Sequence, residues 1–112
     1  MMTLEEFAEM ALSFPESMQG KHFSTTDFRV GGKIFATLRP DKECGVLALS
    51  PGDQALLRET SAHIFEPVPG SWGEKGWTFV MLHTADADAV RHAMAMAWKK
   101  AAPKSVSTRH VL

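Results

Sequence analysis

The sequence predicts one α+β domain: a two-layer sandwich with N- and C-terminal helices packed on a mainly antiparallel sheet. Segments with helical spacing stand near the two ends of the chain. Between them, short β-forming runs are separated by glycine and proline turns, a pattern typical of consecutive hairpins. The chain has 112 residues, 45% hydrophobic and 22% charged, which suffices for one core and one domain.

The best-defined strand is the run Trp77–Leu82, whose aromatic, β-branched and long apolar side chains suit a pleated surface. Alternation sends its odd-numbered members to one face of the sheet and its even-numbered members to the other. Because both sets are apolar, we expect a central strand rather than an edge. We also expect Trp77 to be buried between the sheet and the C-terminal helix, beside Trp98 or Met94.

The terminal helices are marked by their caps. Thr3 and Glu6 form a capping-box pattern, and Pro15 ends the helix by forcing the residue before it out of the helical region. Asp86 or Asp88 caps the last helix. Its expected buried stripe consists of Val90, Met94, Ala97, Trp98 and Ala101.

The pair Gly31-Gly32 predicts a β-hairpin, because glycine readily takes the positive φ of a tight turn. A two-residue turn would pair Val30 with Lys33 and leave Arg29 on the same face as apolar residues of the next strand. A bulged or longer turn is therefore equally compatible with the sequence. The other expected elements are a strand near Phe23, a strand over 44–49, a helix from Ser50 to about Thr60 and a short strand at Ile64 and Phe65. The expected order is α-β-β-β-α-β-β-α.

Charge is distributed unevenly along the chain. The total is −1, but residues 1–20 carry −4, residues 21–42 carry +3, residues 43–98 carry −4 and residues 99–112 carry +4. The near-neutral total gives no global attraction to nucleic acid or to acidic membranes. A locally basic surface is nevertheless compatible with it, although such blocks are often solvated faces.

The sequence predicts a cytoplasmic protein. No apolar run approaches the roughly 20 residues that a membrane-spanning helix needs. The N-terminus carries Glu5, Glu6 and Glu9 where a signal peptide has positive charge. One cysteine, Cys44, cannot form an internal disulfide.

Four segments together resemble the MmcQ/YjbR family of small bacterial proteins. They are Asp27–Ala36, Leu47–Pro51, the block Trp72-Gly73-x-x-Gly76-Trp77 and the ending Trp98–Lys104. The resemblance implies a CyaY-like α+β fold, similar to that of frataxin. It also implies DNA binding, because the family is described as DNA-binding with a "double wing" motif. That expectation comes from the resemblance and not from the composition.

The candidate nucleic-acid contacts are the basic groups of the hairpin region and one lysine of the tryptophan block. Such groups bind phosphates, but lysines at sheet edges also keep those edges soluble and unpaired. Trp72 and Trp77 could stack on bases or could pack in the core. The candidate phosphate-binding residues are Lys21, Arg29, Lys33, Arg39 and Lys75.

No catalytic residue, cofactor or metal is expected. The histidines lack ligand spacing, and Cys44 is interpreted as a small buried apolar residue. Gly31-Gly32-Lys33 lacks the spacing of a P-loop. The carboxylates of the first helix resemble those of frataxin-like proteins, which could hold iron weakly, but they also suit the positive end of a helix dipole.

Two functions follow as hypotheses. The first is a non-enzymatic DNA-binding protein that uses the basic hairpin region. The alternative is a protein- or small-ligand-interaction module that uses an apolar sheet face. That alternative depends on the two apolar faces of Trp77–Leu82 and on Phe28 and Phe35. The sequence does not identify a protein partner or the oligomeric state.

Overall fold

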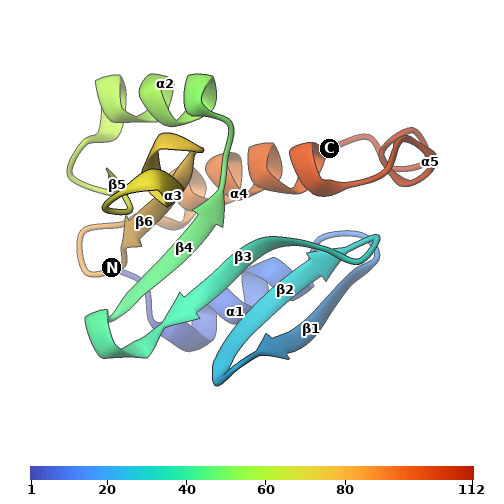
Figure 1. The fold of residues 1–112 in the computed structure, drawn as a ribbon, viewed down its shortest axis with the longest axis horizontal. Coiled ribbons are helices and arrows are strands. Elements are labelled where there is room, and N and C mark those ends of the chain that lie inside the picture. Colours follow the sequence, from blue (N-terminus) through green and yellow to red (C-terminus); the bar gives the residue numbers. More distant parts are fainter.

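Six antiparallel strands form one sheet, in the spatial order β1-β2-β3-β4-β6-β5 (Figure 1). The computed structural model describes every residue from 1 to 112. The strands are β1 (Ser17–His22), β2 (Thr25–Val30), β3 (Lys33–Arg39), β4 (Cys44–Ala48), β5 (Phe65–Pro67) and β6 (Trp77–Met81). The helices are α1 (Leu4–Leu12), α2 (Pro51–Ser61), α3 (Ser71–Glu74), α4 (Ala87–Ala101) and α5 (Lys104–Ser107), with a 3-10 turn η1 (Pro40–Lys42). The predicted α+β class and the packing of both terminal helices on the sheet are confirmed, but four strands rather than the three of the predicted order precede α2.

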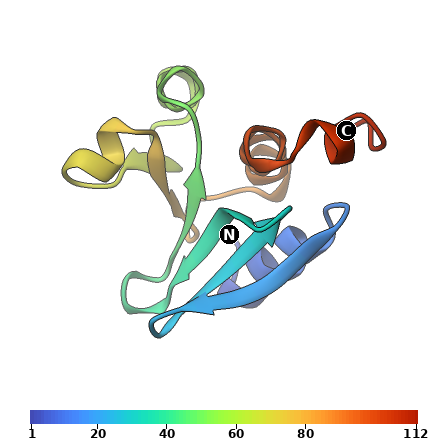
Figure 2. The same cartoon turned by 45° about the vertical axis from the view of Figure 1, so that its right-hand side comes forward.

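Helices α1 and α4 lie on one side of the sheet, which we call the helix face (Figure 2). α4 packs against β2, β3 and β4, and α1 packs against β1, β3 and β4. α2 lies beside β5, and the short helix α3 lies beside β6. No long helix crosses the opposite side, which we call the open face.

The hydrophobic core lies between the helix face and the helices α1 and α4. Phe7, Phe28, Phe35 and Trp98 are all fully buried in it. The indole Nε1 of Trp98 donates a hydrogen bond to the carbonyl oxygen of Pro15 at 3.0 Å, so this side chain joins α4 to the end of α1. The apolar stripe predicted for α4 is confirmed, because every member is buried.

The predicted helix starts are confirmed by their hydrogen bonds. The Thr3 hydroxyl accepts from the Glu6 N–H at 3.0 Å, and the Glu6 carboxylate accepts from the Thr3 N–H at 2.9 Å. Ser50 caps α2, and Asp86 rather than Asp88 caps α4. Each cap satisfies backbone donors that have no partner within the helix.

The β2–β3 hairpin combines a two-residue turn with a bulge, which resolves the alternatives left by the sequence. Val30 pairs with Lys33 across Gly31-Gly32, but Phe28 then pairs with Ala36 instead of Phe35. The extra residue reverses the alternation along β3. As a result Phe35 and Ala36 both enter the core, while Ile34 pairs with Arg29 away from it.

The expected position of Trp77 is wrong. β6 is an interior strand and its side chains alternate as predicted, but Val80 enters the core below the helices. Trp77 is half-buried on the open face, where it packs in a smaller cluster with Val46 and Phe79. The period-2 pattern separates the two faces of a strand, yet it cannot tell which apolar face the helices will cover.

The strand expected near Phe23 is present as β1, but it ends at His22, and Phe23 itself lies in a turn. His22 pairs with Thr25, so Phe23 and Ser24 form a two-residue connection between β1 and β2. β1 is an edge strand of mostly polar residues, which carries little hydrophobic signal. Within residues 19–26 Phe23 is the one apolar side chain, so the sequence pattern placed the strand around it.

The C-terminal segment continues beyond α4. The polar, basic sequence after Pro103 predicts a loosely ordered tail from about residue 104; in the structure this segment includes a one-turn helix, α5, in which Val106 is buried. None of the helices combines the length and the apolarity needed to cross a membrane.

Candidate functional site

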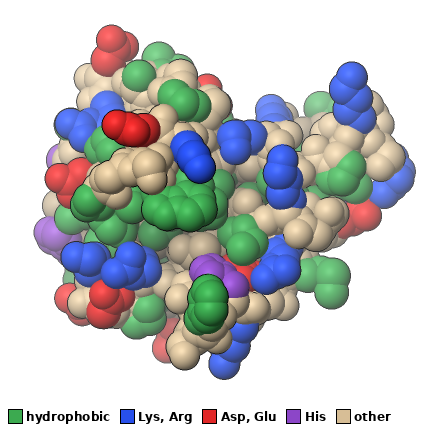
Figure 3. Space-filling model, in the orientation of Figure 1, with side chains coloured by type: hydrophobic (Ala, Val, Ile, Leu, Met, Phe, Trp, Pro, Cys, Tyr) green, Lys and Arg blue, Asp and Glu red, His purple; other side chains and the backbone are tan.

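A half-open cleft of about 640 Å³ lies on the open face. Strands β3, β4 and β6 form its floor. The β1–β2 turn borders it on one side, and the segment from β5 to α3 borders it on the other. Figure 3 shows apolar side chains gathered around this hollow, with basic side chains beside them. The lining consists of His22, Phe23, Thr25, Ile34, Thr37, Arg39, Val46, Val68, Trp72 and Trp77.

The upper wall is built by the block Trp72-Gly73-x-x-Gly76-Trp77, and its glycines are required by close backbone approach. A Cβ on Gly73 would lie 1.8 Å from the Val68 carbonyl oxygen. Gly76 has φ +111°, and a Cβ there would lie 1.9 Å from the Leu49 carbonyl oxygen. No side chain fits at either position, so the turn packs tightly on its neighbours and fixes both tryptophans.

The two tryptophans meet edge to face, with ring centroids 5.7 Å apart and planes at 88°. The Lys75 ammonium lies 5.1 Å from the centroid of the Trp72 ring, at cation–π distance. The Gln54 side-chain amide of α2 reaches the carbonyl oxygens of Gly73 and Trp77, both at 3.1 Å. α2 therefore anchors this wall from behind.

The lower wall is held by a buried carboxylate. Asp27 on β2 is fully buried, and it accepts from Arg29 Nε at 2.8 Å and Arg29 Nη2 at 3.0 Å. His22 Nδ1 lies 2.8 Å from the same carboxylate. The hydrogen bonds from Arg29, with those from His22, hold the pKa of Asp27 below its ordinary value, although burial acts to raise it. This network orients His22 at the mouth of the cleft.

A second arginine lies at the cleft floor. Arg39 donates from Nε and Nη2 to Asp41 at 3.1 and 3.0 Å, and the Asp41 hydrogen bond raises the pKa of Arg39. Its guanidinium carbon also lies 5.9 Å from the Phe79 ring centroid. Lys42 stands at the same distance from that ring, so two cations border the floor beside Phe79.

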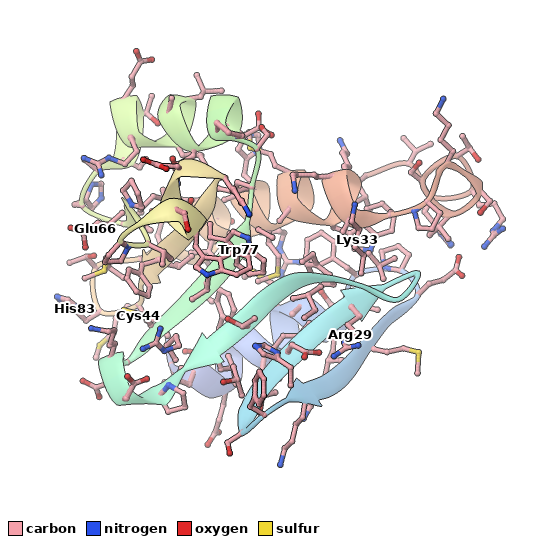
Figure 4. All side chains as sticks on the ribbon, in the orientation of Figure 1. Arg29, Lys33, Cys44, Glu66, Trp77 and His83 are labelled. Carbon is pink, nitrogen blue, oxygen red and sulfur yellow. The ribbon has the colours of Figure 1, made fainter.

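The five sequence-predicted contacts do not form one cluster. Arg39 lines the cleft and Lys75 caps Trp72 at its rim, whereas Lys21 and Arg29 border a smaller hollow nearer the sheet edge. Lys33 begins β3 at the hairpin end, and Figure 4 shows it on the side of Trp77 that faces away from Cys44. The arginines are ion-paired, whereas none of the lysines is in a salt bridge.

The hairpin end touches the C-terminal basic segment, which sequence reasoning did not foresee. A Cβ on Gly31 would lie 2.5 Å from Cγ and Cδ of Pro103. The turn that carries Lys33 therefore packs on the connection between α4 and α5. The exposed basic residues of that connection and its flanks are Lys99, Lys100, Lys104 and Arg109.

Cys44 is buried on the open face, as expected for a small apolar residue. Burial is the largest influence on its thiol and raises its pKa, which disfavours the reactive thiolate. No three histidine, cysteine or acidic side chains converge as a metal site would require. What the cleft offers chemically is a set of aromatic ring faces beside cationic groups.

The cleft also includes residues that the sequence did not indicate, namely His22 and Phe23. The only sequence signal for them was an apolar Phe within a polar segment. Phe23 is fully exposed, and its φ is +55°, in the left-handed region. Glu16 and Glu43 are also exposed with positive φ, so what distinguishes Phe23 is that a bulky aromatic residue takes this conformation at the border of the cleft.

Fold and site together define a small α+β sandwich with an aromatic, cation-rimmed cleft on its uncovered sheet face. A protein-family model described as YjbR matches residues 12–100, and the chain belongs to the YjbR family. A comparison with curated proteins found no match.

Proposed function

We propose that this YjbR-family protein is a cytoplasmic, non-catalytic DNA-binding protein whose phosphate contacts come from the hairpin region and the segment after α4. The observation that supports this proposal best is the packing of Gly31 on Pro103. It brings the +3 segment 21–42 next to the +4 segment 99–112. Contacts between phosphates and lysine or arginine provide most sequence-independent affinity for DNA.

The five candidate phosphate-binding groups differ in how freely they can reach a phosphate. Lys21, Lys33 and Lys75 are exposed and carry no ion pair. Arg29 and Arg39 are each held by an aspartate through Nε and Nη2. Nη2 of Arg29 also donates to the Lys21 carbonyl oxygen at 3.4 Å, so Arg29 keeps Nη1 for a phosphate, whereas Arg39 keeps Nη1 and one N–H of Nη2. We therefore expect the lysines to supply most of the affinity for phosphates and the ion-paired arginines to supply less of it.

The test is duplex DNA binding by fluorescence anisotropy across about 50 to 200 mM salt. Each lost phosphate contact lowers the slope of log affinity against log salt by about 0.9, so Lys33→Ala/Lys104→Ala should lower it by about 2. The control Arg58→Ala/Arg91→Ala removes the same charge from exposed positions on α2 and α4. Absence of binding at low salt, or equal losses in both double variants, would contradict the proposal.

Arg29→Ala is a poor test of DNA contact. It removes the main partner of the buried Asp27 carboxylate, so a loss of binding could follow from a disturbed hairpin. Lys21→Ala avoids this difficulty, because the Lys21 side chain is exposed and unpaired.

A second candidate function is a protein- or small-ligand-interaction module, and the cleft itself favours it. Six of its ten lining residues are hydrophobic, and its volume lies within the usual range of ligand sites. For such a module, ligand affinity should fall in Trp72→Ala and should not respond to Lys33→Ala/Lys104→Ala. Titration of small aromatic ligands, followed by amide chemical shifts of the cleft residues, distinguishes the two functions.

A further inference from the structure

Two exposed aromatic side chains stand on different walls of the open-face cleft. Phe23 lies on the β1–β2 turn, and Trp72 lies on α3, where its side chain is 57% exposed. Neither belongs to the main core. Exposed aromatic rings at the rim of one concave site are typical of surfaces that bind a ligand.

The fold gives no local reason for phenylalanine at position 23. It is the first residue of a two-residue hairpin turn, has φ +55°, and occupies a place where glycine or asparagine is favoured. Its ring is fully exposed and meets only the neighbouring His22 ring, with centroids 6.4 Å apart, so little packing in the monomer offsets the unfavourable backbone conformation. Strain of this kind at the border of a cleft points to a role in binding.

The charges around the cleft select the ligand. None of the lining residues is acidic, and the one arginine of the lining, Arg39, is paired with Asp41 beside it. The Lys75 ammonium lies over Trp72 and the Lys42 ammonium over Phe79, both beside the cleft. A ligand that complements this surface has flat rings and negative charge.

We infer that the cleft binds unpaired bases of single-stranded nucleic acid, stacked on Trp72 and Phe23, while the surrounding lysines contact the phosphates. This inference deepens the proposed DNA binding and rests on it. Strand β3 connects the two surfaces, because Lys33 begins it at the hairpin turn and Arg39 ends it in the cleft. In a duplex the base faces are stacked on each other, whereas in a single strand they are available to aromatic side chains.

The experiment compares three labelled probes of about 12 nucleotides at low salt: oligothymidylate, a duplex, and a backbone of abasic residues. We expect oligothymidylate to bind more tightly than the other two and to quench tryptophan fluorescence. Stacking on one aromatic side chain corresponds to about a 5- to 150-fold change in affinity. Trp72→Ala and Phe23→Ser should therefore each lower oligothymidylate affinity within that range. Phe23→Ser should also leave duplex affinity unchanged, whereas Trp72→Ala removes the ring that Lys75 lies over and is compared on oligothymidylate and the abasic backbone.

Leu56→Ala is the matched control, because Leu56 is an exposed apolar residue of α2 that does not line the cleft. It should bind all probes like the unaltered protein. If the abasic backbone binds as tightly as oligothymidylate, stacking is overturned while phosphate binding stands. If a polyglutamate peptide competes as well as oligothymidylate, the surface recognises charge alone and the inference fails. If no probe binds, the proposed function itself fails.

Discussion

Phe28, Phe35 and Trp98 are fully buried where the helices cover the sheet, whereas Trp72 and Phe23 border a cleft on the opposite face that no long helix covers. Both faces carry large apolar side chains, so their hydrophobicity alone does not distinguish them. What differs is coverage. On the helix face the apolar surface of the side chains is removed from water, and its burial stabilises the fold. On the open face part of it stays in contact with water, where a ligand can use it.

The polar groups differ between the faces as well. The open face carries Asp27 with Arg29 and His22, and Arg39 with Asp41. The helix face has instead a core in which Trp98 makes its one polar contact with a backbone carbonyl. Substitutions on the two faces should therefore separate stability from binding.

The largest expected effect is that of Trp98→Ala, which empties the centre of the core. Substitutions of buried tryptophan by alanine cost about 3–5 kcal/mol of unfolding free energy, a large share of the roughly 5–15 kcal/mol of a domain. Trp77→Ala on the open face should cost about 1–2 kcal/mol, since its ring is only half-buried. Urea unfolding measures both. Equal costs would mean that the open face is part of the core in solution.

Asp27→Asn is expected to cost about 1.5–3 kcal/mol, the range for buried hydrogen bonds that involve charged groups. Asparagine keeps the shape of the side chain, but it replaces one carboxylate oxygen with an amide that cannot accept from Arg29 or His22. The measurement is urea unfolding at neutral pH. An unchanged midpoint would show that this network does not stabilise the hairpin.

The loss of stability in Asp27→Asn should also depend on pH. The pKa of Asp27 is lowered in the fold from its ordinary value of 3.8. A carboxyl of this kind stabilises the fold at pH above 3.8, and the contribution is lost as pH falls through the lowered folded pKa. The difference in unfolding free energy between the protein and Asp27→Asn should therefore shrink below pH 3.8. A difference that grows on acidification would contradict the assignment.

The sequence predicted the fold well because its signals are local. The capping box at Thr3, the Ser50-Pro51 helix start and the spacing of the α4 stripe each fix an element within a few residues. The face of the sheet that the helices cover is not a local property. Trp77 and Val80 are both apolar, so their pattern does not show which of them packs under the helices. The prediction that Trp77 does so is wrong.

The candidate site was less predictable, because it depends on contacts between distant segments. The segments that carry Lys33 and Lys104 are neighbours because Gly31 packs on Pro103. The bulge at Phe35 decides that Thr37 and Arg39, rather than their neighbours, face the cleft, and the sequence left that bulge as one of two alternatives. The tryptophan block was visible in the sequence, but its position opposite the β1–β2 turn was not.

The smallest expected effect is a gain in stability, from Phe23→Gly. A non-glycine residue in the left-handed region costs about 1–2 kcal/mol, while glycine loses about 0.5–1 kcal/mol of unfolded-chain entropy, so a net gain of up to about 1.5 kcal/mol remains. Because the ring leaves the cleft, the same variant should bind oligothymidylate less tightly. Urea unfolding and anisotropy, measured on one preparation, test both parts.

Glu43→Gly is the control for the cost of the left-handed backbone conformation. Glu43 has φ +52° and is exposed at the end of η1, and it does not line the cleft. It should gain similar stability and keep its affinity for oligothymidylate. A loss of stability in Phe23→Gly alone would mean that the ring packs in solution and is not held ready for a base. If both variants gain stability and only Phe23→Gly loses affinity, the open face keeps this phenylalanine for binding at a cost in stability.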